Sequence, residues 1–366
     1  MKITSIYLLT LMIILSCTTK PNASTGTISD YKLKFSRTGK LDRMERGLFG
    51  MGYTTDGEYL YAVNGAAIDL LLRGGIPKYS VNIYGDVSGG GGGKSVTSSI
   101  SSKDLYRYNP EEDKWSIISN KLKAKRFSCS EYIDGEIYVF NGFDFIFYDD
   151  RMNRVVNKNF EAIDTHSGKV SHLSHNPYPA YNSGSAVCDN NIYVFGGAFT
   201  ENQFSNKLLV YNTYRDEWLQ LWNMPEQKTC RGEIIDGILF VFGGYNGRLS
   251  SKIHSYDIEN DMWEYITDMP FGISANAITK HGDFIWLIGD YYKLSMVAVF
   301  DTKTNEFHLI KSNMSGRRHA GAEIIGSKLY VFGGNRQSTG SFLSSIQVAD
   351  ITDIEILLSQ KDSDSN

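Results

Sequence analysis

One short motif recurs along this chain and constrains its fold more than any other feature. Ile192–Gly197 is a run of β-branched and aromatic residues that ends in two glycines, and five altered copies of it are present. A run that is apolar on both faces is typical of a strand covered on both sides, and glycine after it permits a positive φ angle. The six copies, here called the glycine elements, end at residues 65, 142, 197, 244, 290 and 334.

Their spacing predicts the architecture. Successive ends lie 77, 55, 47, 46 and 44 residues apart. A period in the forties, lengthened twice, is typical of propeller blades that carry loop insertions. A second spacing accompanies it, because a strand ending in an aromatic residue follows each glycine element and a large residue comes seven positions later. The pairs are Tyr108 and Trp115, Tyr211 and Trp218, Tyr256 and Trp263, Phe300 and Phe307, with weaker forms in Tyr148 and Val155 and in Ala349 and Ile356.

The glycine pair, the tyrosine and the tryptophan at these spacings resemble the kelch repeat. The resemblance covers about residues 46–358 and implies an all-β fold, a six-bladed kelch-type β-propeller with four antiparallel strands per blade. We expect this domain to span residues 30–359 and its tryptophans to pack between adjacent blades. The repeat residues that carry the resemblance are Gly196, Gly197, Gly243, Gly244, Gly333, Gly334, Trp115, Trp218 and Trp263.

The first residues indicate export. Lys2 precedes an apolar run, Ile6–Leu15, that is too short for a comfortable membrane span. Ile14–Cys17 resembles the lipobox of bacterial lipoproteins, which implies a signal peptide over 1–16 and lipidation of Cys17. An ordinary signal peptide with an incidental cysteine is the alternative. The resemblance implies lipid anchoring to a bacterial membrane, with the outer membrane facing the periplasm as the expected location.

The two ends of the propeller leave one question open. Residues 17–29 are predicted to be a flexible tether, and residues 360–366 a polar tail. Either Tyr31–Phe35 or Ile354–Leu358 fits the fourth strand of the last blade. The two long insertions, expected at 66–103 and 157–182, are predicted to lie on one face. Long loops in a compact domain are often functional, so this face is the candidate binding surface.

The charge and the cysteines of the chain argue against some classes of partner and cofactor. The formal net charge is −4, and charges of both signs are interspersed, which argues against a nucleic-acid groove. The three cysteines after Cys17 match no metal-ligand spacing. We therefore expect no metal and no cofactor, and contact with a membrane only through the lipid anchor.

Charged residues repeat in register with the glycine elements. Glu131, Glu233 and Glu323 each lie 11 residues before the end of an element. Arg126, Lys228 and Arg318 lie five residues before these glutamates. Buried carboxylates need partners, so the first interpretation is structural, with each glutamate accepting hydrogen bonds from a neighbouring blade. The second is a ligand site, in which Arg126 and Arg318 grip an acidic group.

Two functions remain open. The first is a non-catalytic binding module for a glycan or a protein, in which aromatic residues just after the glycine elements contact the ligand. These are Phe143, Tyr245, Tyr291 and Tyr292. The second is a sugar-active enzyme that resembles the kelch-type sialic acid mutarotases (N-acetylneuraminate epimerases). Its candidate residues, by type alone, are Arg126, Arg318, Glu131, Glu233 and Glu323. A fold by itself implies no activity.

Overall fold

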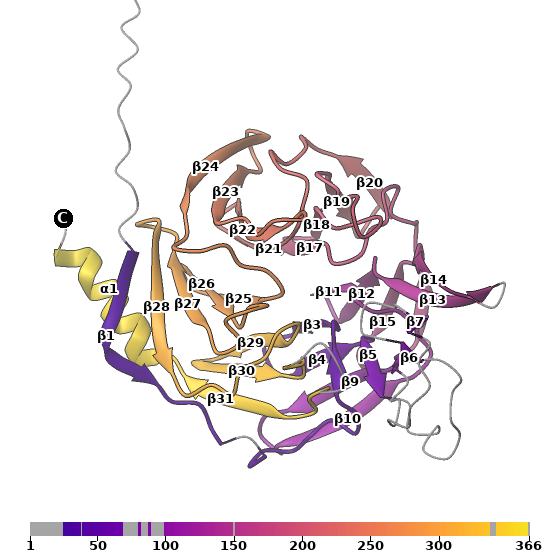
Figure 1. Cartoon of the computed structure of the whole chain (residues 1–366), viewed down its shortest axis with the longest axis horizontal. Coiled ribbons are helices and arrows are strands. Elements are labelled where there is room, and N and C mark those ends of the chain that lie inside the picture. The colour runs from indigo at the N-terminus through magenta and orange to yellow at the C-terminus, as the bar shows by residue number, and fades with distance from the viewer. Residues whose placement is uncertain are drawn as a thin grey trace, which may run out of the picture.

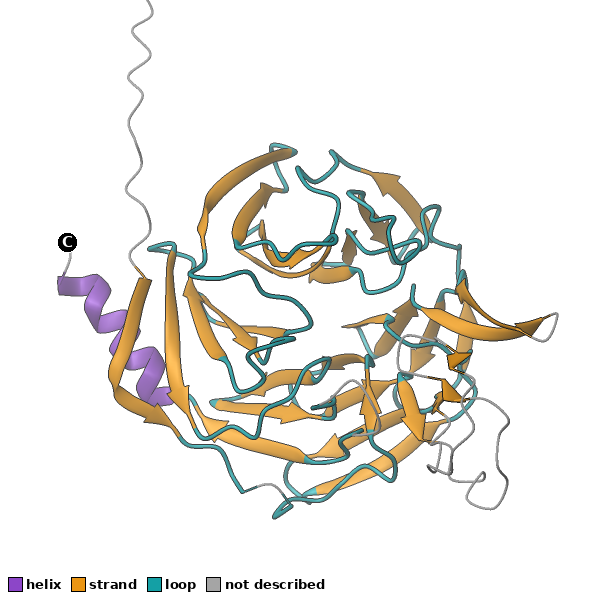
Figure 2. Cartoon of the chain, in the orientation of Figure 1, coloured by secondary structure: helices purple, strands orange, loops and turns teal. Residues whose placement is uncertain are grey.

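The computed structural model describes residues 25–37, 39–68, 80–81, 87–88, 99–148, 151–336 and 342–364. These residues form β-strands and loops with one helix, α1 (Thr352–Asp364) (Figure 2). None of the described helical residues forms a segment long and apolar enough to cross a membrane. The predicted signal peptide, Cys17 and the first part of the predicted tether lie outside the described residues.

In the part of the chain that the structure describes, six of the sheets, numbered here in chain order, surround a central axis (Figure 1). The first holds β3 (Gly52–Thr55), β4 (Leu60–Val63), β9 (Leu105–Asn109) and β10 (Lys114–Ser119), and the second holds β11 (Cys129–Ile133), β12 (Glu136–Phe140), β15 (Glu161–Asp164) and β16 (Val170–His172). The third holds β17 (Gly184–Cys188), β18 (Asn191–Phe195), β19 (Leu208–Asn212) and β20 (Glu217–Gln220). The fourth holds β21 (Thr229–Ile235), β22 (Ile238–Tyr245), β23 (Lys252–Asp257) and β24 (Met262–Asp268).

The last two sheets complete the ring. The fifth holds β25 (Ala277–His281), β26 (Phe284–Ile288), β27 (Val297–Asp301) and β28 (Glu306–Ser312), and the sixth holds β29 (Gly321–Ile325), β30 (Lys328–Phe332) and β31 (Ile346–Asp350). Among the described residues, the first strands contact one another in the order β3, β11, β17, β21, β25, β29 and back to β3. The expected all-β propeller of antiparallel sheets is confirmed.

The seven-residue spacing has a simple cause, since its two residues face each other across a tight hairpin. Tyr108 lies opposite Trp115 in the β9–β10 pair, and Tyr256 lies opposite Trp263 in the β23–β24 pair. The Tyr108 hydroxyl donates a hydrogen bond to the Asp113 carboxylate at 2.8 Å. Asp113 has a φ angle of 49°, in the left-handed region that Asx residues tolerate. The aspartate therefore both closes the turn and satisfies the buried tyrosine.

The repeat tryptophans pack between neighbouring sheets, as expected. Trp115 contacts Phe332 of the sixth sheet, with ring centroids 5.6 Å apart. Trp218 contacts Phe140 of the second sheet at 6.4 Å. Trp263 packs against a cluster of buried residues that includes Phe195 of the third sheet. Each tryptophan therefore joins its own sheet to the preceding one.

The assignment of the second unit was wrong in one respect. Tyr148 and Val155 do not belong to the second sheet, because β13 (Phe143–Tyr148) and β14 (Arg151–Val156) form a separate hairpin. The third and fourth strands are β15 and β16, in which Ile163 lies opposite Val170, also seven residues apart. The inserted segment is thus 143–156 and not 157–182.

Both insertions therefore follow a glycine element directly. In the first sheet, the inserted residues include β5 (Ala66–Ile68), β6 (Ser80–Val81), β7 (Val87–Ser88) and β8 (Ser99–Ser101), and β5 also pairs with β2 (Leu48–Phe49). The Ser101 hydroxyl donates a hydrogen bond to the Asp144 carboxylate at 2.6 Å, which ties β8 to the β13–β14 hairpin. The two insertions lie side by side at the end of the ring where the second strands finish. We call this end the mouth.

Neither of the two segments predicted as the fourth strand of the last blade takes that place in the sixth sheet. β1 (Thr25–Leu33) pairs in parallel with β28 as a fifth strand of the fifth sheet. The next segment reaches the sixth sheet, where the Ser36 amide donates to the Val348 carbonyl at 2.8 Å. Ile354–Leu358 is not a strand, since it lies in α1, which buries Ile354 and Leu358. The first described strand thus begins at Thr25, within the predicted tether, and α1 continues to Asp364, within the predicted tail.

Candidate functional site

A ring of backbone groups surrounds the mouth. It is formed by the residues that lie 15 positions before the end of each glycine element, namely Gly50, Phe127, Asn182, Thr229, Ala275 and His319. Five of the six have positive φ angles, from 50° to 60°, and Thr229 is the exception. Neighbouring members are joined by hydrogen bonds, such as that from the Asn182 amide to the Phe127 carbonyl at 2.9 Å. A left-handed angle costs a non-glycine residue about 1–2 kcal/mol, and these bonds hold it in place.

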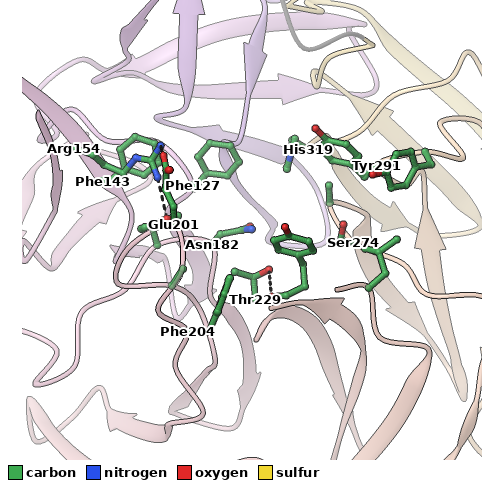
Figure 3. Close-up of a pocket in the computed structure, with 16 residues that line it drawn as sticks. Phe127, Phe143, Arg154, Asn182, Glu201, Phe204, Thr229, Ser274, Tyr291 and His319 are labelled. Atoms are coloured by element: carbon green, nitrogen blue, oxygen red, sulfur yellow. Dashed lines mark hydrogen bonds and ion pairs between the residues drawn. The ribbon is translucent and has the colours of Figure 1, made fainter. Parts of the chain in front are cut away.

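The mouth contains a pocket of about 400 Å³ (Figure 3). Five of the six ring residues contribute to its lining, and residues just after the glycine elements form its walls. The sixteen lining residues are Phe127, Phe143, Arg154, Tyr181, Asn182, Ala198, Glu201, Phe204, Thr229, Tyr245, Leu249, Ser274, Ala275, Tyr291, Tyr292 and His319. Seven of them are Phe or Tyr, so aromatic rings form a large part of the lining.

All four aromatic residues singled out in the sequence line this pocket. Phe143, Tyr245 and Tyr291 come directly after the ends of three glycine elements, and Tyr292 follows Tyr291. Phe143 is buried, whereas Tyr245 and Tyr292 are exposed. The rings of Phe143 and Phe127 are stacked with centroids 5.7 Å apart. The aromatic surface is therefore partly fixed by packing and partly open to solvent.

One wall of the pocket carries an ion pair. Arg154, on the inserted β14, places its guanidinium carbon 4.8 Å from the Phe143 ring centroid. It donates hydrogen bonds to the Tyr181 hydroxyl and to a carboxylate oxygen of Glu201, both at 3.0 Å. Figure 3 shows this pair at the edge of the pocket. The Glu201 side chain is exposed, so a ligand can reach the pair.

The two candidate arginines lie behind the pocket wall and do not line it. Arg126 donates from Nε to the Ser101 hydroxyl at 3.0 Å and lies 4.9 Å from the Phe145 ring. Burial lowers the pKa of Arg126 to about 10. The Arg318 guanidinium lies 4.0 Å from the Tyr291 ring and donates to the Tyr291 carbonyl at 3.3 Å. These arginines support aromatic residues of the pocket from within the fold.

The three glutamates lie deeper, around a second cavity of about 50 Å³. Burial and the charge of Glu233 raise the pKa of Glu131 to about 8. The same two causes, in that order, raise the pKa of Glu323 well above its ordinary value, and burial raises that of Glu233. Thr279 donates to the Glu323 carboxylate at 3.0 Å, and the Lys280 ammonium lies 3.5 Å from that of Glu233.

An arginine absent from the predictions separates the two cavities. Arg231 lines the deeper cavity and donates from Nη2 to the side-chain oxygen of Asn182, a residue of the mouth pocket, at 2.9 Å. Its Nη1 donates to the Ser183 carbonyl at 2.9 Å. The two cavities have no lining residue in common. The structure thus brings the three glutamates together but does not place Arg126 or Arg318 with them.

Among the described residues, no three His, Cys, Asp or Glu side chains are arranged to hold a metal ion. Cys129, Cys188 and Cys230 carry free thiols, and burial raises the pKa of each. A thiol whose pKa is raised is a poor nucleophile. The chemistry that the mouth offers is therefore contact with aromatic rings, together with a few hydrogen-bonding groups and the Arg154–Glu201 pair.

Comparison with known proteins agrees with this architecture. Residues 80–290 match the family model described as the KLHDC2/KLHL20/DRC7 Kelch-repeats domain. Beta-scruin of Limulus polyphemus is 22% identical over 276 residues, which cover 69% of this chain and 30% of the relative. Kelch-like protein 23 of Homo sapiens is 25% identical over 179 residues, which cover 48% of this chain and 29% of the relative. The alignments thus span less than a third of either relative.

The family assignment rests on two independent observations. The matched segment, 80–290, is more than half of the 366 residues. Glycine pairs end three of the six glycine elements, and residues seven apart face each other in the third and fourth strands of the first five sheets. The chain belongs to the kelch-repeat family.

Proposed function

We propose that this propeller is a non-catalytic binding module whose mouth pocket receives part of a protein partner. The observation that carries the proposal is the pocket itself, with seven Phe or Tyr residues among the sixteen that line it. Aromatic side chains are enriched where proteins bind one another, because they offer a large contact area at little entropic cost. The kelch homologues favour a protein-binding role as well.

The pocket indicates what the partner must present. A volume of about 400 Å³ has room for a few side chains, since pockets for whole small molecules measure about 300–1,000 Å³. An apolar side chain would fill the space between Phe127 and Tyr291. Asn182 and Thr229 also line the pocket and would offer hydrogen bonds to the backbone of the inserted segment. Arg154 and Glu201 would bind polar groups at the edge.

A glycan is the second candidate ligand. Its support is the exposure of Tyr245 and Tyr292, whose faces are open to stacking on sugar rings. The enzymatic alternative has less support. A substrate in the mouth pocket would be separated from Glu131, Glu233 and Glu323 by Arg231, and a cavity of about 50 Å³ is smaller than a sugar.

The geometry of the first strand supports a particular orientation if Cys17 is lipidated, as we propose. β1 runs parallel to β28, with Thr25 opposite Phe307 and Leu33 opposite Ser312. β28 is a fourth strand, so it runs towards the mouth from the opposite end of the ring. The chain therefore enters the propeller at the end away from the mouth. A lipid anchor at Cys17 would leave the pocket facing away from the membrane.

A photo-crosslinking experiment tests the pocket. A photoreactive amino acid replaces Tyr292 at the pocket edge or, as the control, Ile117, which is exposed on β10. In cells that produce the chain, we expect one protein to be crosslinked from position 292 and not from position 117. Adding Tyr291→Ala should abolish that product. Crosslinks that are equal at both positions, or that persist with Tyr291→Ala, would contradict the proposal, and a product containing only glycan would support the second candidate.

A further inference from the structure

Large apolar side chains that do not line the mouth pocket are exposed on the outer edge of the third and fourth sheets. Leu219, Trp222 and Tyr265 are 61%, 70% and 52% exposed. β20 and β24, which carry Leu219 and Tyr265, are the outermost strands of these neighbouring sheets (Figure 1). Single exposed apolar residues are ordinary on protein surfaces, but a group of them marks an interaction site.

Hydrogen bonds to the Trp222 backbone tie the loop after β20 to the fourth sheet. Trp222 follows β20, and its carbonyl accepts a hydrogen bond from Nε1 of Trp263 at 3.0 Å. The Trp222 amide donates a hydrogen bond to an Asp261 carboxylate oxygen at 3.3 Å. Tyr265 comes two residues after Trp263 in the same strand and therefore shares its face. We call Leu219, Trp222 and Tyr265 the outer surface.

The propeller does not need a tryptophan at position 222. In the second sheet, the equivalent residue is Ser174. Its carbonyl accepts a hydrogen bond from Nε1 of Trp218, and its amide donates to Asp216, as Trp222 does with Trp263 and Asp261. The same connection between neighbouring sheets is therefore made there without an apolar side chain.

The outer surface is surrounded by negative charge. Residues 214–226 and 257–268 contain one cationic residue, Arg215, and eight carboxylates, Asp216, Glu217, Glu226, Asp257, Glu259, Asp261, Glu264 and Asp268. Glu226 forms ion pairs with Lys228 and Lys252, so the other seven carboxylates supply the negative charge of the rim. Glu217, Glu259 and Glu264 are exposed, and none of them forms an ion pair with a cation in the part of the chain that the structure describes. An apolar surface with this rim complements a partner that is apolar and positively charged.

We propose that the outer surface docks a basic amphipathic segment of a protein partner. Apolar side chains of the segment cover Leu219, Trp222 and Tyr265, and its Lys or Arg side chains meet the carboxylates of the rim. The same charge disfavours two other occupants. A second copy of this chain would bring like charges together, and an anionic lipid surface would be repelled. This docking is independent of the ligand in the mouth.

The probe is a synthetic helical peptide of about 14 residues, long enough for nearly four turns, with Leu on one face and Lys on the other. A matched peptide carries Glu in place of Lys. Binding is measured by fluorescence anisotropy of the labelled peptide at two salt concentrations. We expect the Lys peptide to bind, more weakly at high salt, and the Glu peptide not to bind. Trp222→Ser should weaken binding by about tenfold or more, as for truncation of an aromatic residue central to an interface.

Two further variants separate the apolar and charged contributions. Glu217→Gln combined with Glu264→Gln should weaken binding and reduce its dependence on salt. Ile117→Ser is the matched control, because Ile117 occupies the position of Tyr265 in the first sheet, two residues after the repeat tryptophan, and is 44% exposed. It should leave binding unchanged. Circular dichroism and the midpoint of thermal unfolding show that each variant is folded.

Several results would overturn the proposal. These are failure of the Lys peptide to bind, equal binding of both peptides, or equal binding by wild type and Trp222→Ser. Light scattering and vesicle flotation address the other occupants. Dimers that dissociate in Trp222→Ser would assign the surface to a second copy, and binding to vesicles of anionic lipid that is lost in Trp222→Ser would assign it to a membrane. Either result would replace the protein segment as the occupant.

Discussion

The three glutamates around the deeper cavity should make this propeller more stable at mildly acidic pH than at neutral pH. Replacing Glu131 by Gln tests this, because it keeps the side-chain volume and removes the titrating group. Burial and the charge of Glu233 raise the pKa of Glu131 from 4.5 to about 8 in the folded state. The groups that face this cluster are Lys280, Arg231 and Tyr53. Between these two pKa values the folded state holds a proton that the unfolded state has released.

The sign and size of the effect follow from proton linkage. A pKa raised in the folded state means that stability is fully present below the unfolded pKa and is lost as pH rises through the folded pKa. The loss is about 1.4 kcal/mol per pH unit for each proton held. From about pH 5.5 to about pH 7.5, one such proton contributes about 2.7 kcal/mol. With an unfolding entropy of about 2.1 cal/mol/K per residue, this corresponds to roughly 4 °C in the midpoint of thermal unfolding for a domain of this size.

Differential scanning calorimetry across this pH range measures the effect. The wild-type midpoint should fall as pH rises, and Glu131→Gln should lose roughly 4 °C of that change. Glu264→Gln, at an exposed glutamate, is the matched control and should follow the wild type. The three glutamates interact, so the remaining slope in Glu131→Gln reports Glu233 and Glu323 as a pair. Identical pH dependence in wild type and Glu131→Gln would refute the reasoning.

Two other predictions concern the interior and the chain start. Lys125 and Glu161 form a fully buried ion pair of 3.1 Å, so Lys125→Met should cost about 3–5 kcal/mol of unfolding free energy by leaving Glu161 buried without its cation. Adding Glu161→Leu should recover most of that loss in urea denaturation, and a double variant as unstable as the single one would contradict it. Cys17→Ser should release the chain from the membrane fraction, if the thiol is lipidated as proposed. A variant that stays membrane-bound would exclude lipidation as the means of attachment.

The sequence predicts the frame of the propeller well because two spacings have direct geometric causes. Glycine pairs end the second strand of a sheet, and residues seven apart face each other across the following hairpin. Tyr211 and Trp218, for example, are cross-strand partners in β19 and β20. Both constraints act within one unit and are independent of the rest of the chain. They therefore appear as fixed intervals in the sequence.

The second unit shows where this reasoning fails. Tyr148 and Val155 have the expected spacing, and Tyr148 is aromatic, whereas both residues of the actual pair, Ile163 and Val170, are aliphatic. The inserted hairpin is rich in aromatic residues for another reason, since Phe143 and Phe145 pack with Tyr181 and Phe127 beside the mouth pocket. Spacing alone does not distinguish a blade strand from an inserted hairpin of the same period.

The site was predictable in part. Residues just after the glycine elements line the pocket because every element ends at the mouth. The backbone ring was missed, since Phe127, Asn182 and His319 share no chemistry, although all lie 15 residues before the end of an element. Arg154 and Arg231 were missed because no other unit repeats them. For the ring residues, the distance in sequence from the end of a glycine element, and not the residue type, was the usable signal.

The affinity of the crosslinked partner for the mouth pocket tests the central claim most directly. Titration calorimetry compares wild type, Tyr291→Ala and Tyr214→Ala, the last at an exposed tyrosine outside the pocket. We predict that Tyr291→Ala weakens binding by about tenfold or more, the loss typical of an aromatic residue central to an interface. Tyr214→Ala should bind as the wild type does. Unchanged affinity in Tyr291→Ala, with the variant folded, would contradict the assignment of the mouth pocket as the binding site.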